Sequence, residues 1–340
     1  MKSLQGVWSL GCAILALGGL VASAPARAAD DFYKDKTINI VVGFTPGGGY
    51  DAYARQLARF LSDHVPGKPN VIVQNMPGAG SLTAVRALDV TQPKDGTVMA
   101  IFNPGLIVQS IVQPEKTPVD FRKYLFVGTV TPDFRVCYGF GPKGVKSWDD
   151  MMSRKEFILG STAKGSGNYV NGASLREVFN APVKQILGFP GSNEQRLAIE
   201  RGELDGDCGS FNSIPPSWLT EGKVHPFVRF TREKESYMPD SARFIEEFAT
   251  TDEQRQILAV INSGDEVGRP VIVSRDIPAE RLAILRRAFD AVMKDPTFKA
   301  DMAKQTLPVY PINGPDSDQM VARMLNTPRA ITDKVRIIFE

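Results

Sequence analysis

Residues 38–51 read INIVVGFTPGGGYD, and this stretch decides the fold. Its first residues are mostly β-branched, which favours a buried strand. Gly47, Gly48 and Gly49 follow, and three glycines without Cβ atoms allow positive φ angles and close approach of a ligand to bare N–H groups. Apolar residues then recur at the spacing of one helical face, at Tyr53, Leu57, Phe60 and Leu61. The stretch therefore predicts a strand, a glycine loop and a helix, whose N-terminus favours an anion.

The glycine loop has two interpretations. It is either a tight turn with no ligand or an anion-binding loop. The stretch contains neither G-x-G-x-x-G nor G-x-x-x-x-G-K-[ST], so it does not predict a dinucleotide or P-loop nucleotide site. We expect no cofactor.

The composition describes a globular protein with little net charge. The chain has 340 residues, enough for two domains, with 40 basic and 38 acidic residues. The two basic residues of the first 28 positions are Lys2 and Arg27, so the rest of the chain is balanced in charge. This balance argues against binding to nucleic acid or to an anionic membrane surface.

The N-terminal 28 residues have the pattern of an export signal. Lys2 precedes an apolar run over residues 8–21, and Ala26-Arg27-Ala28 fits the rule of small residues at the cleavage site. The alternative is a membrane anchor, but the apolar run is shorter than the roughly 20 residues of a full span. The sequence around Cys12 is a poor lipoprotein signal. We therefore expect cleavage near Ala28 and a mature protein in the periplasm.

Two cysteines, Cys137 and Cys208, remain after that cleavage. An oxidising compartment allows them to form a disulfide, and the alternative is two buried small apolar side chains. The sequence leaves both open, because it does not give their separation. Their spacing does not match a zinc site, and we expect no metal site.

Further strands, each ending in a polar loop with glycine, follow the opening stretch. Residues 71–73 and 98–102 are predicted strands, followed by turns at 75–81 and 103–105. Alternation of strands and helices predicts a parallel α/β sheet, in which ligands bind beyond the carboxyl ends of the strands.

A second unit of the same kind begins near Phe126. Its predicted strands are residues 136–140, 157–159, 185–188 and 204–208. The loop over residues 161–169, rich in Gly and Ser, repeats the order of strand, glycine loop and helix. A strand at 270–274 and an amphipathic helix through 282–292 then complete the first unit. The predicted division is a signal peptide at 1–28, a first lobe at 29–125 plus 271–340, and a second lobe at 126–270.

Several of these segments together resemble one family. They are INIVVGFTPGGGYDAYAR (38–55), VIVQNMPGAGSLTAVRAL (71–88), PKDGTVMAIFNPG (93–105), GFPGSNEQRLAIERGELDGDCGS (188–210) and PVIVSRDIPAERLAILRRAFDAVMKDPTF (270–298). In this order they resemble the tripartite tricarboxylate transporter receptor family, the Bug or TctC-like periplasmic solute-binding proteins. The loop at 165–169 departs from many members because it has no histidine soon after its glycines.

The resemblance implies a two-lobed periplasmic binding protein of type II-like α/β fold, each lobe a mainly parallel sheet flanked by helices. It also implies that the two glycine loops hold a ligand carboxylate between the lobes, partly through water, and that the partner is an inner-membrane permease. The residues and the resemblance together predict a monomeric receptor that captures a small organic anion by hinge closure. Delivery to that permease is implied by the resemblance alone. The sequence does not identify the anion.

The predicted ligand-binding residues are mostly uncharged donors in these loops, together with aromatic residues beside them. They are Phe44, Thr45, Gly47, Gly48, Gly49, Tyr50, Gly78, Ala79, Gly80, Ser81, Asn103, Thr162, Lys164, Gly165, Ser166, Gly167, Asn168, Phe189 and Ser210. Lys164 either pairs with the anion or is solvated. Asp51 is interpreted as a helix-capping residue, and Asp205 and Asp207 as turn and edge residues.

An enzyme is the less favoured alternative. The chain has only two histidines, His64 and His225, both in predicted loops, and it lacks the serine-hydrolase and zinc-protease motifs. We therefore predict no catalytic residues. A receptor that presents its ligand to a membrane sensor kinase is a further alternative, which the sequence does not separate from a transport receptor.

Overall fold

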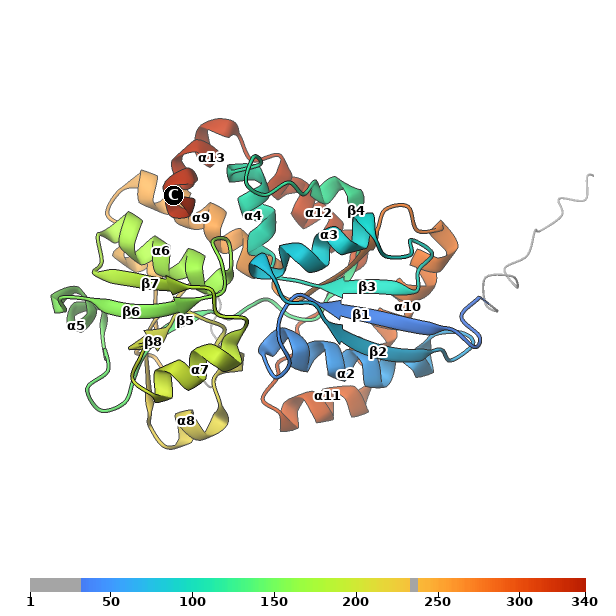
Figure 1. Cartoon of the computed structure of the whole chain (residues 1–340), viewed down its shortest axis with the longest axis horizontal. Helices are drawn as coiled ribbons and strands as arrows, with labels where there is room; N and C mark the ends of the chain where they lie inside the picture. Colours follow the sequence, from blue (N-terminus) through green and yellow to red (C-terminus); the bar gives the residue numbers. More distant parts are fainter. Residues whose placement is uncertain (1–31, 233–237) are drawn as a thin grey trace, which may run out of the picture.

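The computed structural model describes residues 32–232 and 238–340, in two α/β lobes that lie side by side (Figure 1). The predicted signal peptide at 1–28 lies outside the described residues. Among the described residues, no helix has the length and apolar character needed to cross a membrane.

The first lobe contains a six-stranded sheet in the order β12-β4-β11-β3-β1-β2. Its strands are β1 (Thr37–Val42), β2 (Asn70–Asn75), β3 (Val98–Ile101), β4 (Tyr124–Thr129), β11 (Pro270–Ser274) and β12 (Ile312–Asn313). The helices that follow these strands are α2 (Gly49–His64), α3 (Leu82–Val90), α4 (Gly105–Val112), α10 (Ala279–Lys294), α11 (Pro296–Lys304), α12 (Gly314–Leu325) and α13 (Arg329–Val335).

The second lobe contains a sheet in the order β10-β9-β5-β8-β6-β7. Its strands are β5 (Val136–Phe140), β6 (Phe157–Ser161), β7 (Val183–Leu187), β8 (Gly206–Asp207), β9 (Val224–Arg229) and β10 (Arg243–Phe244). Its helices are α5 (Trp148–Ser153), α6 (Gly167–Phe179), α7 (Ser192–Glu200), α8 (Pro216–Thr220) and α9 (Asp252–Val267). Helix α13 packs against α9, and the 3-10 turn Arg336–Phe339 packs against α6, so the last described residues lie beside the second lobe (Figure 1).

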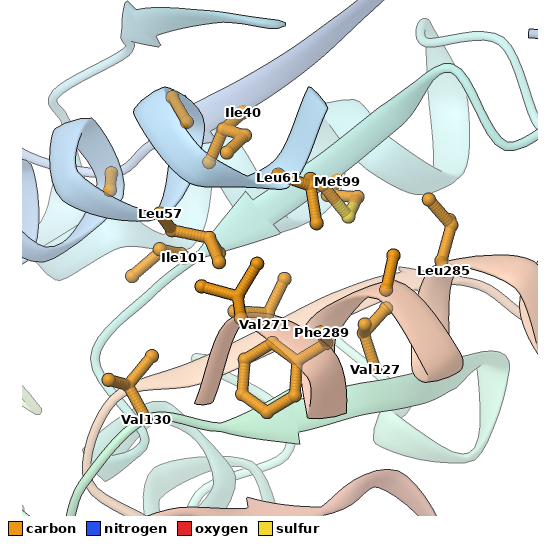
Figure 2. Close-up of a cluster of buried hydrophobic side chains, with 14 of the residues drawn as sticks. Ile40, Leu57, Leu61, Met99, Ile101, Val127, Val130, Val271, Leu285 and Phe289 are labelled. Carbon is orange, nitrogen blue, oxygen red and sulfur yellow. The ribbon is translucent and has the colours of Figure 1, made fainter. Parts of the chain in front are cut away.

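The main core of the first lobe lies between its sheet and helices α2 and α10. Leu57 and Leu61 of α2 face Ile40, Ile101 and Val271 of the sheet, and Leu285 and Phe289 of α10 pack into the same cluster beside α2 (Figure 2). Tyr53, Leu57 and Leu61 are almost fully buried, as their helical spacing predicts, whereas Phe60 is half-buried at the edge. Burial of this apolar surface is the main favourable free energy of the lobe.

Both sheets are mixed, and parallel pairs outnumber antiparallel pairs in the second sheet but not in the first. Strand β11 is antiparallel to both β3 and β4, and β5 is antiparallel to both β8 and β9. Strand β5 is the first strand that the chain forms in the second lobe, and β11 is the first that it forms after returning to the first lobe. The predicted boundary at residues 125 and 126 divides β4, which pairs along its length with β11, so the chain leaves the first sheet only after Thr129.

The chain passes between the lobes through two adjacent segments, residues 130–135 and 268–269, which we call the crossing segments. They are hydrogen-bonded to each other, because the N–H of Arg269 donates to the carbonyl of Thr131 at 2.9 Å and that of Val130 to the carbonyl of Arg269 at 3.1 Å. Two short paired segments thus connect the lobes.

A disulfide joins Cys137 of β5 to Cys208, the residue after β8. The sequence left this pairing open, and the strand register explains it. Tyr138 pairs with Asp207 across the antiparallel ladder, which places the two cysteines opposite each other. Both side chains are fully buried. The bond therefore fixes β8, and Asp207 with it, against the strand that follows the first crossing segment.

We predict that replacing both cysteines, Cys137→Ala with Cys208→Ala, lowers the free energy of unfolding by about 2–4 kcal/mol, because the disulfide closes a loop with a sequence separation of 71 residues. Urea unfolding of the oxidised protein and the variant measures the difference. Reduced wild-type protein is the control and should match the variant. Equal unfolding free energies for the oxidised protein and the variant would contradict the prediction.

Candidate functional site

A small cavity of about 60 Å³ lies between the lobes, beside the crossing segments. Its walls come from both lobes and from the segments between them: Phe44, Gly48, Gly49, Tyr50 and Asn103 from the first lobe, Thr162, Ser166, Gly167, Asn168, Ser192, Asp207, Gly209, Ser210 and Ser213 from the second, and Arg135 and Arg269 from the crossing segments. We call this space the interlobe cavity.

Three helices begin at the interlobe cavity. Helix α2 follows its N-cap Gly48, α6 follows Ser166, and α7 follows Gly191, and none of these N-caps makes a side-chain capping hydrogen bond. Each helix follows a strand end and a loop that contains glycine, β1 for α2, β6 for α6 and β7 for α7. Uncapped first-turn N–H groups and the positive ends of three helix dipoles therefore favour an anion at this place.

A buried ion cluster lies on the crossing segments beside the cavity. Asp133 contacts Arg135 at 2.7 Å and Arg269 at 3.0 Å, and Arg135 also contacts Asp265 of α9 at 2.9 Å. All four side chains are at least nine-tenths buried. Burial alone would raise the pKa of Asp133, but the two guanidinium groups hold it below its usual range. The ion cluster thus keeps charge inside the protein at the joint between the lobes.

Aromatic and hydroxyl groups surround the two arginines. The guanidinium of Arg269 lies 4.0 Å from the ring centroid of Tyr50 and donates to Ser210 Oγ at 2.7 Å. The ring of Tyr50 stacks on Phe44, with 4.8 Å between centroids. Burial raises the pKa of Tyr50 to about 12, so its hydroxyl is a neutral group. The Tyr50 hydroxyl and Thr162 Oγ1 are buried without a hydrogen-bond partner among the described residues.

Two buried carboxyl groups have raised pKa values, Asp207 at the cavity and Asp265 behind Arg135. Burial raises the pKa of Asp207 to about 6, against weaker opposing effects of Arg135 and of hydrogen bonds from Cys208 N–H and Asn168. Burial also raises the pKa of Asp265 to about 8. Arg135 lowers this pKa, but the negative charge of Asp133 offsets part of that effect.

The lobes touch around the rim of the cavity, so the structure is a closed form. Asn103 Nδ2 donates to the carbonyl of Gly165 at 2.8 Å, and Thr45 Oγ1 lies 3.1 Å from Glu194 Oε2. Arg196 Nη2 donates to the carbonyl of Gly47 at 3.2 Å. These three contacts join loops of the first lobe to the Gly165 loop and to helix α7 of the second lobe.

Ten predicted ligand-binding residues line the interlobe cavity. They are Phe44, Gly48, Gly49, Tyr50, Asn103, Thr162, Ser166, Gly167, Asn168 and Ser210. Thr45, Gly47 and Gly165 make the contacts at its rim.

The other predicted residues do not reach the cavity. Gly78, Ala79, Gly80 and Ser81 form a turn behind Asn103, where Ser81 Oγ accepts the N–H of Asn103 at 3.0 Å. Phe189 packs within the second lobe. Lys164 Nζ bonds to the main-chain oxygen of Glu340 instead of facing the site. Asp51 accepts the N–H of Gly47 at 2.9 Å and pairs with Arg55, which fits its interpretation as a capping residue.

The sequence reasoning missed the charged residues of the site. Arg135, Asp207 and Arg269 line the cavity, as do Ser192, Gly209 and Ser213, and none of these six was among the predicted ligand-binding residues. The interpretation of Asp207 as an edge residue was wrong, because its side chain is buried at the cavity. Their position in the sequence could have indicated the two arginines, because Arg135 and Arg269 each directly precede a predicted strand near a predicted lobe boundary.

A larger pocket of about 660 Å³ lies apart from these residues. Phe134, Phe244, Asn262 and Tyr310 are among the side chains that line it, and none of its lining residues begins an α-helix. The interlobe cavity therefore has the stronger chemistry for a small anion, although it is the smaller space in this closed form.

We predict that the free energy of unfolding falls as the pH rises from 6 to 8. In this range Asp265, with a pKa of about 8, stays protonated in the folded protein but is ionised in the unfolded chain, where its pKa is near 4. The unfolded state then binds fewer protons, so raising the pH favours it, by roughly 2 kcal/mol over this range. Asp265→Asn should remove this decline in urea unfolding.

The control for this prediction is Asp63→Asn, whose carboxyl lies in a surface pair with its side chain 72% exposed. It should keep the wild-type decline. An Asp265→Asn variant that loses as much stability between pH 6 and 8 as wild type would show that this carboxyl is not the group that titrates.

Known proteins are similar to this chain over its length in fold and, more weakly, in sequence. No protein-family model matches the chain. It is 23% identical over 340 residues to the "UPF0065 protein in gbd 5'region" of Cupriavidus necator, covering 96% of this chain and 95% of that protein. Periplasmic binding protein BugD superposes with a TM-score of 0.71 at 18% identity, covering 88% of this chain and 98% of that one.

A second solved structure, MatC from Rhodopseudomonas palustris with bound malate, superposes with a TM-score of 0.68 at 18% identity, covering 90% of this chain and 99% of that one. The resemblance to Bug/TctC-like periplasmic solute-binding proteins is confirmed, as is the two-lobed α/β fold. These structural neighbours are binding proteins rather than enzymes.

Proposed function

Taking the Bug/TctC-like fold as the premise, we propose that this chain is a periplasmic receptor that holds a small organic acid in the interlobe cavity. The observation that carries the proposal is the convergence of three uncapped helix N-termini, those of α2, α6 and α7, on one cavity between two lobes. Such N-termini bind carboxylates through main-chain N–H groups. The malate bound to the similar protein MatC supports the same class of ligand.

The ligand is held mainly by neutral donors that are already in place. The first-turn N–H groups after Gly48 and Ser166 belong to different lobes, so a carboxylate between them links the lobes. Arg135 and Arg269 add a positive field, but each is already paired with Asp133. A site in which most donors are neutral binds a carboxylate without forming a full ion pair. The weaker interaction permits release of the ligand to a transporter.

Capture requires opening and closing about the crossing segments. The closed cavity of about 60 Å³ has rim contacts from both lobes, so the ligand enters an open form and closure buries it. Delivery to an inner-membrane permease of the tripartite tricarboxylate type, by a monomeric receptor, is part of this proposal. So is export by the signal at residues 1–28, with cleavage near Ala28.

We predict that mature protein, residues 29–340, is stabilised in a thermal-shift screen by at least one small mono-, di- or tricarboxylate and not by the matching neutral amide. At about 1,000 times its dissociation constant the acid adds roughly 4 kcal/mol to the free energy of unfolding. The amide lacks the negative charge that the helix N-termini favour, so it serves as the control. Shifts of equal size for acids and amides would contradict a carboxylate site.

We predict that Gly48→Val weakens binding of the acid found in that screen at least about 100-fold, or roughly 3 kcal/mol, in isothermal titration calorimetry. Gly48 has extended backbone angles that valine tolerates, but a Cβ there lies 2.9 Å from Ser192 Oγ across the cavity. The added methyl groups then block closure and the approach of a ligand to the N–H groups.

The matched control is Ala279→Val, at the exposed first residue of α10 in the same lobe. It should bind like wild type. Unchanged affinity in Gly48→Val, with the fold intact by circular dichroism, would contradict the placement of the ligand at the start of α2.

A further inference from the structure

Asp207 is the one acidic residue lining the interlobe cavity that has no ion-pair partner within residues 32–232 and 238–340. The neighbouring acids differ, since Asp133 contacts both arginines and Asp265 contacts Arg135. Asp207 is 9% exposed, and its Oδ1 is buried without a hydrogen-bond partner among the described residues. A buried carboxylate in this state costs free energy until a donor reaches it.

The position of Asp207 is fixed by covalent and backbone structure. It ends β8, it pairs with Tyr138 of β5, and the next residue forms the disulfide to Cys137. A Cβ on Gly209 would lie 2.3 Å from Asp207 Oδ2, so the glycine leaves room for this carboxyl group. The carboxylate therefore stays beside the cavity and does not turn to solvent.

The charges around the cavity argue against a ligand that is only anionic. At pH 7 Arg135 and Arg269 carry two positive charges and Asp133 and Asp207 carry two negative ones, because a pKa of about 8 keeps Asp265 mainly neutral, so these groups have no net positive charge left over for an anion. A ligand with carboxylates at both ends would place one of them beside Asp207, where two like charges repel in a buried site. A ligand with a cationic N–H group at that end meets an acceptor instead.

We propose that the ligand is a zwitterionic amino acid, with its carboxylate at the N-termini of α2 and α6 and its ammonium group directed at Asp207. This inference rests on the proposed function and names its substrate class. Asp207 is then the residue that determines specificity for the amine. At pH 7 the carboxyl group is mainly ionised, because its pKa of about 6 lies below that pH.

The size of the cavity agrees with a small ligand. A space of about 60 Å³ holds roughly four water-sized groups, since one water needs about 10–15 Å³ by the same measure. This space suits a short amino acid better than a tricarboxylate when the lobes are closed.

Matched pairs of ligands test the proposal in isothermal titration calorimetry. The pairs are alanine with propionate, aspartate with succinate, glutamate with glutarate, and γ-aminobutyrate with butyrate, which differ within each pair by the amine. We expect at least one amino acid to bind 10-fold or more tightly than its deaminated partner. Deaminated acids that bind as tightly as, or more tightly than, their amino acids would overturn this inference and leave the proposed receptor function standing.

Asp207→Asn provides the second measurement. It keeps the shape and one acceptor but removes the charge, so the affinity for the amino acid should fall 10- to 100-fold while that for the deaminated partner stays equal or rises. Asp205→Asn, an exposed position two residues earlier, is the control and should keep the wild-type preference. An unchanged preference in folded Asp207→Asn overturns the role of Asp207. Absence of binding by both members of every pair overturns this inference, whereas the receptor proposal is decided by the wider carboxylate screen.

Discussion

The ion cluster of Asp133, Arg135, Asp265 and Arg269 is the constraint on which the rest of the structure depends. Two guanidinium groups are buried where the chain passes between the lobes, and isolated burial of such charges is very unfavourable. Asp133 meets both of them, and Asp265 meets Arg135 from α9. Removing one partner of such a cluster typically costs about 3–5 kcal/mol, so the crossing segments and α9 must keep their relative positions.

The same cluster positions groups around the interlobe cavity. Arg269 holds the ring of Tyr50, at the start of α2, through a cation–π contact and holds Ser210 of the second lobe through a hydrogen bond. The side chain of Arg269 thereby connects the start of α2 in the first lobe to Ser210 in the second lobe. The helix N-termini supply an anion site, and the cluster brings them together because it lies at the joint about which the lobes move.

Local patterns in the sequence predicted the parts of the site that are local. Gly48 and Ser166 lie in loops between a strand and a helix. Such a loop places its N–H groups at the carboxyl end of the sheet, whatever the position of its strand in the strand order. Arg135 and Asp207 could not be predicted in this way, because charged residues are usually exposed and their burial here depends on partners from distant segments. The alternation rule predicted Asp207 at an edge, but it does not include the disulfide that fixes its strand.

The strands also divide into those that the local sequence predicts and those that depend on distant partners. Strands such as β1, which is rich in β-branched apolar residues, and β3, which is apolar throughout, were predicted. Strand β9 contains Pro226 and His225, and β10 and β12 have two residues each, so their pairing depends on the neighbouring strand more than on their own sequence. The mixed sheets follow from these strands and from β11, whose antiparallel direction is set by the return of the chain through the crossing segment.

The most direct test of the account is a crystal structure of the mature protein with the acid that stabilises it most. The account predicts density for that acid in the interlobe cavity, with a carboxylate oxygen about 3 Å from the first-turn N–H groups of α2 and α6. The acid seated instead in the 660 Å³ pocket beside Phe134 and Asn262, with no ligand between the lobes, would contradict it.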